Sequence, residues 1–325
     1  MLLPYISRHI YNQRMTTALI YDPLYLRHET GLHPENAERL RAIAAVLDAD
    51  ENLQARVKNL LPRSASDEDL LRCHGEQLVG QVRTFCERGR PFMDLDTVIC
   101  PESFRVAKLA AGAAMTGIDE VFQGNASNAF AFVRPPGHHA TAHRSMGFCL
   151  FNNAAVGARY AQARYGAERV LIIDWDVHHG NGTQDIFYKD PTVFYFSTHQ
   201  YPFYPGTGAA TETGNGKGEG FTLNIPLHEN TSAHSHREAF TDALKVIESD
   251  FPPDLIIISA GFDARIDDPL GGLLLEDADF VEMTKKVMDM ADRHAGGRVV
   301  SLLEGGYNID TLGETVRTHV STLAG

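Results

Sequence analysis

VLIIDWDVHHGNG, residues 170–182, joins a short apolar run to an acidic, histidine-rich tip. The run 170–173 is long enough for a strand buried on both faces, which is typical of a parallel sheet. Asp174, Asp176 and His178 are two residues apart, so their side chains share one face if the strand continues past the run. Carboxylates and an imidazole at one point suggest a metal. For this motif alone, the alternative is a capping aspartate followed by solvated histidines.

The composition is that of a globular, enzyme-sized chain. Hydrophobic residues make up 43% and charged residues 22% of the 325 residues, which argues against disorder and against a membrane partner. The formal net charge of -13 argues against a nucleic-acid partner and slightly favours cationic substrates. The four cysteines include no CxxC pair, so we expect neither a disulfide framework nor a zinc finger, and a reducing, cytoplasmic compartment.

Apolar runs alternate with helical patterns along most of the chain. Strands are predicted at 18–21, 129–133, 170–173, 192–196, 255–258 and 299–303, and helices at 33–49, 76–88, 103–122, 152–165, 232–248 and 276–293. The Gly-rich segment 199–220 is predicted to be a loop. This alternation predicts one α/β domain of residues 15–325 with a doubly wound parallel sheet. Residues 1–14 form an N-terminal extension, which is either upstream sequence or an ordered arm.

Reactive residues follow four of the predicted strands. In open parallel sheets, ligands bind beyond the carboxyl ends of the strands, so these tips are the places to look for a site. Any one tip could be ordinary turn chemistry or a helix cap, but four together predict an active site. The tips are RPPGHH (134–139), DWDVHHGNG (174–182), SAGFDARIDDPLGG (259–272) and EGGYN (304–308).

Asp176, His178 and Asp263 form a candidate metal-ligand set. Two carboxylates and one imidazole leave a coordination position open, which is the catalytic arrangement for Zn²⁺, although Fe²⁺ or Co²⁺ would also be accepted. A binuclear manganese site of the arginase kind would need carboxylates where Gly180 and Arg265 stand. The sequence therefore predicts one catalytic metal per chain.

His138 and His139 are the candidate acid and base, because adjacent imidazoles can divide the two proton transfers of amide hydrolysis. Asp174 is expected to orient His138 and to raise its basicity. Tyr307 lies on a loop that two glycines are expected to make flexible, and its hydroxyl could donate to the oxyanion of a tetrahedral intermediate. The alternative for Tyr307 is a packed aromatic at a strand end.

These motifs, together with GFCLFNN (147–153) and LEGGYN (303–308), resemble the zinc-dependent histone deacetylase superfamily, most closely its class II and bacterial amidohydrolase-like members. The resemblance implies an arginase-deacetylase fold with a mostly parallel central sheet, helices on both faces and long active-site loops. It also implies hydrolysis of an N-acyl amide, typically acetyl-lysine. The implied roles are zinc ligands for Asp176, His178 and Asp263, a dyad of His138 and His139, and carbonyl polarisation by Tyr307.

The resemblance also implies residues that contact substrate and product. Gly147 and Phe148 resemble one wall of the acyl-lysine tunnel, and Tyr204 stands opposite, where relatives often have Phe. Asp96 resembles the acidic rim residue that binds the substrate backbone, and Arg39 an arginine on the product-release side.

Asn181 replaces the second histidine-orienting aspartate of class I relatives, so the pKa of His139 should be lower than a carboxylate partner would make it. The family also binds structural K⁺ or Na⁺ beside the zinc. The positions that match these monovalent-cation sites are Asp174, Asp176, His178, Ser197 and Thr198 for the first site, and Phe187, Asp190, Val193 and Phe221 for the second.

Three functions remain open: a deacetylase of acyl-lysine in proteins or small molecules, an acetylpolyamine amidohydrolase, and a non-catalytic acetyl-lysine-binding module. Leu270 stands where polyamine-selective relatives carry an acidic residue, which favours the first. A degenerate binding module would be expected to lose a ligand, the dyad or Tyr307, and this chain loses none. The natural substrate, the acyl chain and formation of a homo-oligomer stay open.

Overall fold

A computed structural model describes residues 16–325. The predicted extension 1–14 lies outside the described residues, as does Met15, with which the predicted domain begins. The strands are β1 (Thr17–Ile20), β2 (Val57–Leu60), β3 (Asn128–Ala131), β4 (Val170–Asp174), β5 (Val193–Gln200), β6 (Thr222–Leu227), β7 (Leu255–Ala260) and β8 (Val299–Leu303).

The helices connect these strands and cover them. They are α1 (Ala37–Ala49), α2 (Glu51–Gln54), α3 (Asp67–Leu71), α4 (Glu76–Glu87), α5 (Ser103–Phe122), α6 (Asn153–Tyr165), α7 (Asn181–Phe187), α8 (Ala233–Asp250), α9 (Asp277–His294) and α10 (Ile309–Leu323), with 3-10 turns η1 (Pro23–Arg27) and η2 (Gly216–Gly218).

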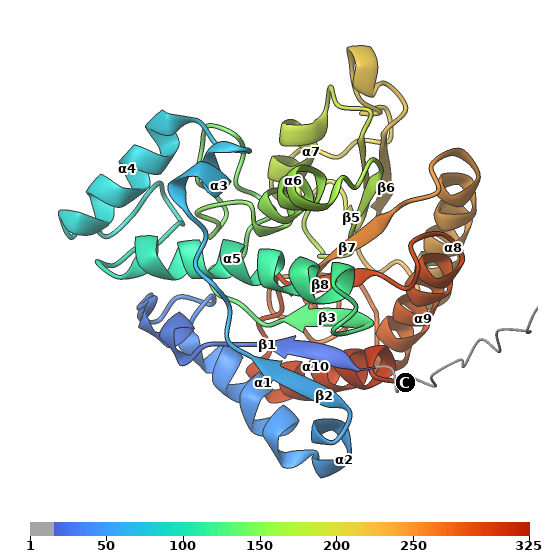
Figure 1. Ribbon diagram of the computed structural model, residues 1–325, viewed down its shortest axis with the longest axis horizontal. Helices are drawn as coiled ribbons and strands as arrows, with labels where there is room; N and C mark the ends of the chain where they lie inside the picture. The colour runs from blue at the N-terminus through green and yellow to red at the C-terminus, as the bar shows by residue number, and fades with distance from the viewer. Residues whose placement is uncertain (1–15) are drawn as a thin grey trace, which may run out of the picture.

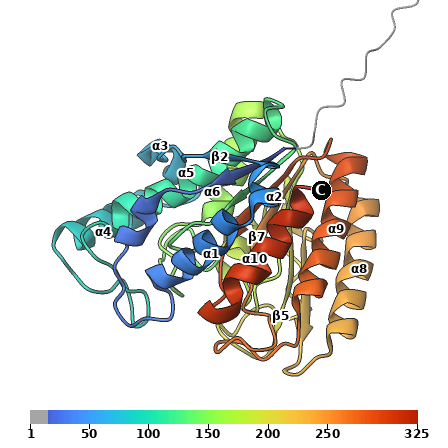
Figure 2. The same ribbon diagram turned by 90° about the horizontal axis from the view of Figure 1, so that it is seen from below.

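The eight strands form one sheet in the order β2-β1-β3-β8-β7-β4-β5-β6, and every neighbouring pair is parallel (Figure 1). Helices α5 and α6 pack on one face, and α8, α9, α10 and α1 lie side by side on the other (Figure 2). Every residue of β4, β7 and β8 is therefore buried, as their continuous apolar runs predict. The prediction of one doubly wound sheet with helices on both faces is confirmed, and the described sheet is entirely parallel.

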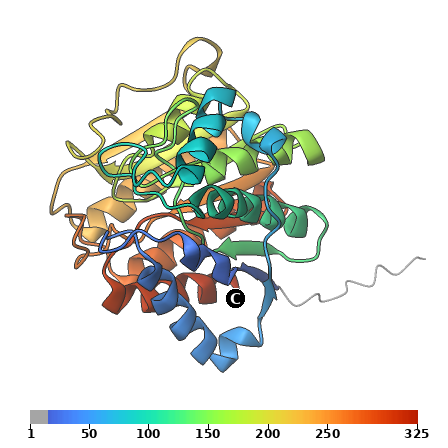
Figure 3. The ribbon, with the colours of Figure 1, turned by 90° about the vertical axis from the view of Figure 1, so that its left-hand side faces the viewer.

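The strand register brings the reactive tips to one edge of the sheet. Asp174 at the end of β4 pairs with Ser197 on β5 and with Ser259 on β7, and Ala260 pairs with Leu303 on β8. The segments after β4, β7 and β8 consequently start at nearly the same level. Figure 3 shows the long loops gathered along the left-hand side of the molecule.

Several boundaries differ from the sequence-based predictions for physical reasons. Helix α1 begins at Ala37 and is capped by the side chain of Asn36, so Pro34 and Glu35 precede the helix instead of starting it. Strand β5 continues through Gln200, two residues into the segment predicted as loop. Among residues 16–325, no helix combines the length and the apolar composition needed to cross a membrane.

Candidate metal centre and active site

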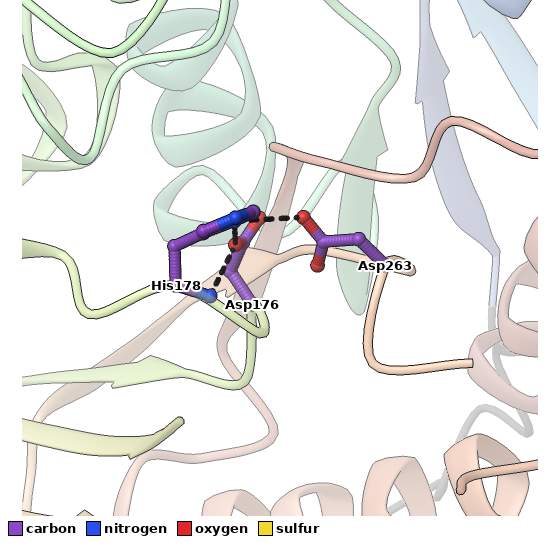
Figure 4. A group of neighbouring side chains, drawn as sticks. All are labelled: Asp176, His178 and Asp263. Atoms are coloured by element: carbon purple, nitrogen blue, oxygen red, sulfur yellow. Dashed lines mark hydrogen bonds and ion pairs between the residues drawn. The ribbon is translucent and has the colours of Figure 1, made fainter. Parts of the chain in front are cut away.

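Asp176 and His178 follow β4, and Asp263 follows β7. One ligand atom from each of the three side chains lies within 4.8 Å of the other two (Figure 4). His178 Nδ1 is 3.1 Å from Asp176 Oδ1 and 3.2 Å from Asp263 Oδ2. Strand β4 ends at Asp174, so it is the loop, and not a continued strand, that makes these groups converge.

The charges in this cluster fit a bound cation. Asp263 Oδ2 is buried, and no group of residues 16–325 other than the His178 imidazole partners it. Burial and the charge of Asp176 raise the pKa of Asp263 to about 7. Burial opposes the charged form of His178, but its hydrogen bonds to Asp176 and Asp263 and their charges outweigh burial and raise its pKa to about 10. These buried carboxylates and the imidazole lie close enough to shift one another's pKa values. Together they form a donor set that suits Zn²⁺.

Two glycines allow the carboxylates to be packed this closely. A Cβ atom on Gly305 would lie 2.0 Å from Asp263 Oδ2, and the Gly305 N–H donates to Asp176 Oδ2 at 2.8 Å. Gly305 is therefore required for close approach, a role that the sequence reasoning did not foresee. A Cβ atom on Gly180 would lie 2.1 Å from Asp174 Oδ2, and Arg265 pairs with Asp277. A second catalytic metal would need carboxylates at positions 180 and 265. These positions hold instead a glycine packed against Asp174 and an arginine paired with Asp277.

The two candidate dyad histidines are adjacent, with ring centroids 4.0 Å apart. His138 Nδ1 lies 3.1 Å from Asp174 Oδ2, and His139 Nδ1 lies 2.8 Å from Asn181 Oδ1. Asp174 is fully buried and also accepts from the hydroxyl of Tyr195 at 3.1 Å. The structure therefore brings each histidine to the partner that the sequence predicted for it.

These surroundings shift the pKa values of the two imidazoles in opposite directions. Burial disfavours a charged His138, but the charges of Asp176 and Asp174 outweigh burial and raise its pKa well above the usual range. Burial lowers the pKa of His139, and the neighbouring His138 and His178 lower it further. The neutral amide of Asn181 does not offset this. One imidazole is thus kept charged and the other neutral, which suits an acid and a base.

Glu304, which sequence reasoning did not single out, holds the dyad loop. Its buried carboxylate accepts from the backbone N–H groups of Gly137 at 2.6 Å and His138 at 3.1 Å, and from the Ser259 hydroxyl at 3.1 Å. Burial raises its pKa to about 7, although the nearby His138 opposes this. The only signal in the sequence was an acidic residue directly after an apolar run.

Tyr307 is held from two sides. Its backbone N–H donates to Asp268 Oδ2 at 2.6 Å, and the guanidinium of Arg39 lies 4.7 Å from its ring centroid. Burial raises the pKa of Tyr307 well above its usual range, so the phenol keeps its proton. The Tyr307 hydroxyl makes no hydrogen bond with any of residues 16–325. Asp268 was missed by the sequence reasoning. Arg39, which the resemblance put on the product-release side, is buried behind the Tyr307 ring, and its role there stays a prediction.

A cavity of about 480 Å³ leads to this centre. The ring centroids of Phe148 and Tyr307 are 6.0 Å apart, and those of Tyr204 and His139 are 5.1 Å apart; each pair meets edge to face. Phe148 has a positive φ of 70°. The ring of Phe203, which the sequence reasoning missed, stacks on His178 at 5.3 Å. The other predicted substrate residues, Gly147, Leu270 and Asp96, also line the cavity.

The predicted monovalent-cation residues form two separate groups. Ser197 and Thr198 lie beside Asp174 on the neighbouring strand, but their hydroxyls are 2.8 Å from His199 and 3.0 Å from His236. In the second group, the Asp190 carboxylate is 2.6 Å from Arg159 Nη2. Phe187 and Phe221 use their carbonyl oxygens in backbone hydrogen bonds, from Asp190 and Tyr195 respectively, and Val193 begins β5. Cation binding at either group stays a prediction.

Comparisons with known proteins agree with this geometry. A family model described as "Histone deacetylase domain" matches residues 33–323. The chain is 40% identical over 298 residues to a probable deacetylase of Archaeoglobus fulgidus, covering 91% of this chain and 82% of that protein. It is 39% identical over 311 residues to a histone deacetylase-like amidohydrolase of Pseudomonas aeruginosa, covering 90% and 82%.

A solved structure shows the same fold. The crystal structure of the HDA15 HD domain matches with a TM-score of 0.91 at 40% sequence identity, covering 96% of this chain and 89% of that chain. The arginase-deacetylase fold expected from the motifs is therefore confirmed. Because the family model spans most of the chain, this protein belongs to the histone deacetylase family.

Proposed function

We propose that this chain is a deacetylase with one catalytic Zn²⁺, and that it removes acetyl groups from lysine side chains of proteins or small molecules. The observation that carries the proposal is the cluster of Asp176, His178 and Asp263 in a cavity beside two imidazoles with opposite pKa shifts. Membership of a deacetylase family supports hydrolysis of an acetylated amide.

The protein's own groups can carry the proton transfers. Bound Zn²⁺ would supply Lewis-acid chemistry, namely polarisation of the acyl carbonyl and activation of water as the nucleophile. His139 lines the cavity and is neutral, and its Nδ1–H points to Asn181, which leaves Nε2 free to accept a proton from the attacking water. His138, kept charged by Asp174, supplies the acid for the departing amine.

The cavity walls position the acyl group. Phe148 and Tyr204 enclose the lysine stem and exclude water from it. The Tyr307 hydroxyl, which has no other partner among the described residues, donates to the oxyanion that the carbonyl oxygen becomes when water adds to the acyl carbon. Arg39, behind the Tyr307 ring, is the proposed contact on the product-release side.

Two further assignments belong to the same proposal. The family match over residues 33–323 and the start of β1 at Thr17 support a catalytic domain of residues 15–325. K⁺ or Na⁺ at the group around Asp174, Ser197 and Thr198 would act structurally, next to the dyad.

The alternative function is hydrolysis of acetylated polyamines. Leu270 lines the cavity without a charge, which favours acyl-lysine, but Glu229 lines the same cavity and supplies an acid from another loop. A non-catalytic binding module is disfavoured because the chain retains the three candidate ligands, both candidate dyad histidines and Tyr307.

A deacylation screen tests these functions. Zinc-loaded protein is offered acetyl-, trifluoroacetyl- and longer acyl-lysine peptides beside acetylated polyamines, with Asp263→Ala protein as the inactive control. We expect turnover of acetyl-lysine that the control lacks. Binding of acetyl-lysine without turnover of any acylated amine would overturn the proposal in favour of the binding module.

A further inference from the structure

The mouth of the cavity carries negative charge without a matching positive charge. Its lining includes two carboxylates, Asp96 and Glu229, and among residues 16–325 no lysine or arginine lines it. Because the chain also has a formal net charge of -13, the long-range potential does not cancel this local charge.

The two carboxylates differ in how they are engaged. Asp96 accepts a hydrogen bond from the Thr97 hydroxyl at 3.3 Å, and its neighbour Asp94 lies 3.3 Å from Arg144. The carboxylate of Glu229 makes no hydrogen bond or ion pair with any residue in the range 16–325, and its side chain is exposed. Glu229 is therefore the free acid of the cavity mouth.

The backbone around Glu229 is held in place. The Thr231 N–H donates to the His228 carbonyl oxygen at 3.0 Å, which closes the turn after β6. The Asn230 N–H donates to the Gly272 carbonyl oxygen at 2.8 Å, and the Gly272 N–H donates to Gln200 Oε1 at 2.7 Å. The turn is thus tied to β5 and to the segment that follows Leu270.

The stem of Glu229 also lies directly against this segment. A Cβ atom on Gly272 would be 2.7 Å from Glu229 Cγ, so the side chain occupies the space beside the glycine. Two residues earlier, Leu270 contributes an uncharged side chain to the same cavity. Residues 269–272 line the cavity without a charge, and the neighbouring loop places an acid there instead.

We propose that Glu229 selects substrates that carry a second positive charge, an ammonium or guanidinium group, outside the tunnel that holds the acyl-lysine stem. The inference rests on the proposed deacetylation and names its substrate class. A cation at the mouth gains an ion pair with a carboxylate that has no other partner. The cation can come from a lysine or arginine beside the acyl-lysine in a protein, or from a second amine of a small substrate.

Two matched substrate pairs test the proposal with zinc-loaded protein. The first pair is an acetyl-lysine peptide with either lysine or glutamine next to the acetyl-lysine. The second pair is an N-acetylated diamine and an N-acetylated alkylamine of equal chain length. The measurement is the ratio of kcat/KM between the charged and the uncharged member of each pair, in wild type, Glu229→Gln and a control, Glu168→Gln.

We expect wild type to prefer the charged member by about 3- to 5-fold, the scale of an exposed ion pair. Glu229→Gln should lose most of this preference. Glu168 is exposed and lies just before β4, at the end of the strands opposite the cavity. Glu168→Gln should therefore keep the preference despite the same change of charge. The preference should also shrink as salt is raised from about 0.02 M to about 0.5 M, because salt screens an exposed pair.

The outcomes separate the two possible sources of the cation and the two proposals. A Glu229-dependent preference in the peptide pair points to a flanking basic residue, and one in the diamine pair points to a polyamine-like substrate. If wild type and Glu229→Gln show the same preference in both pairs, the inference about Glu229 is wrong. Turnover of the uncharged peptide would then still support the proposed deacetylation. Failure of wild type to turn over any of the four substrates overturns both.

Discussion

The guanidinium of Arg39 lies 4.7 Å from the centroid of the Tyr307 ring and donates hydrogen bonds to the carbonyl oxygens of Glu304 and Gly306, both at 2.6 Å. This one side chain from α1 therefore supports both the end of β8 and the loop that carries the proposed oxyanion donor. Arg39 is in turn held by Glu35, whose Oε1 lies 3.3 Å from Arg39 Nη1. Glu35 also pairs with the buried Arg134.

The first prediction concerns the stability of this charged network. Burial works against the charged form of Glu35, but the charge and hydrogen bonds of Arg134 outweigh it and lower its pKa to about 2. Because this pKa lies below the unfolded value near 4.5, the contribution is complete above pH of about 4.5 and is lost as pH falls toward 2. Glu35→Gln should lower the free energy of unfolding at pH 7 by about 3 kcal/mol.

Urea unfolding at pH 7 and pH 4 checks this prediction, and the difference between wild type and Glu35→Gln should be smaller at pH 4. The matched control is Glu38→Gln, because Glu38 pairs with Arg41 on the exposed side of α1. That variant should stay within about 1 kcal/mol of wild type. A Glu35→Gln protein as stable as the Glu38→Gln protein at pH 7 would show that the network contributes little.

The second prediction concerns Glu304 as a positioning residue. A glutamine there can no longer accept all three hydrogen bonds from Gly137, His138 and Ser259, because one terminal atom becomes a donor. The loop that carries His138 should shift, and kcat should fall by about 10-fold, equivalent to one buried hydrogen bond. Zinc content and KM should change little. Measurement of kcat, KM and metal content separates this effect from loss of the site, and an unchanged kcat would contradict it.

The core of the fold could be predicted because its strands are buried on both faces. Strands β4, β7 and β8 are short, continuous apolar runs, and such runs are visible in a single sequence. Strand β2 was missed because it is an edge strand in which Lys58 and Asn59 are exposed. Strand β6 was missed because it contains Pro226 and follows a Gly-rich loop.

The site was predictable to the extent that its residues stand at strand ends. Asp176, His178 and Asp263 carry their chemistry in their side-chain type, so position and type together suffice. The roles of Asp268 and Phe203 depend instead on contacts with residues distant in the chain. Asp268 contacts Tyr307, and Phe203, after β5, contacts His178, after β4. No periodicity or local spacing encodes such contacts.

The third prediction concerns the metal. Because Asp263 Oδ2 is buried and, among residues 16–325, is partnered only by the His178 imidazole, a cation should bind here and stabilise the folded state. Chelation should abolish deacetylation and lower Tm, and one Zn²⁺ per chain should restore both. Asp263→Ala should abolish tight zinc binding. Metal analysis and thermal unfolding provide the measurements, and two tightly bound catalytic ions per chain would contradict the single-metal site.

The last prediction concerns the Tyr307 hydroxyl. If it stabilises charge that develops only in the transition state, Tyr307→Phe should lower kcat for acetyl-lysine by roughly 10²- to 10³-fold, the scale of losing one oxyanion donor. Substrate affinity should barely change, since the hydroxyl is not needed for ground-state binding. Zinc content should be normal, because Tyr307 is not among the three candidate ligands.

A trifluoroacetyl substrate sharpens this test, because its carbonyl is already activated and depends less on polarisation by the phenol. Tyr307→Phe should therefore slow trifluoroacetyl-lysine less than acetyl-lysine. Tyr165→Phe is the matched control, since it removes a hydroxyl that pairs with Asp119 between α5 and α6, away from the cavity. If Tyr307→Phe turned over acetyl-lysine as fast as Tyr165→Phe, the oxyanion role would be wrong, and Tyr307 would be an aromatic packed over Arg39.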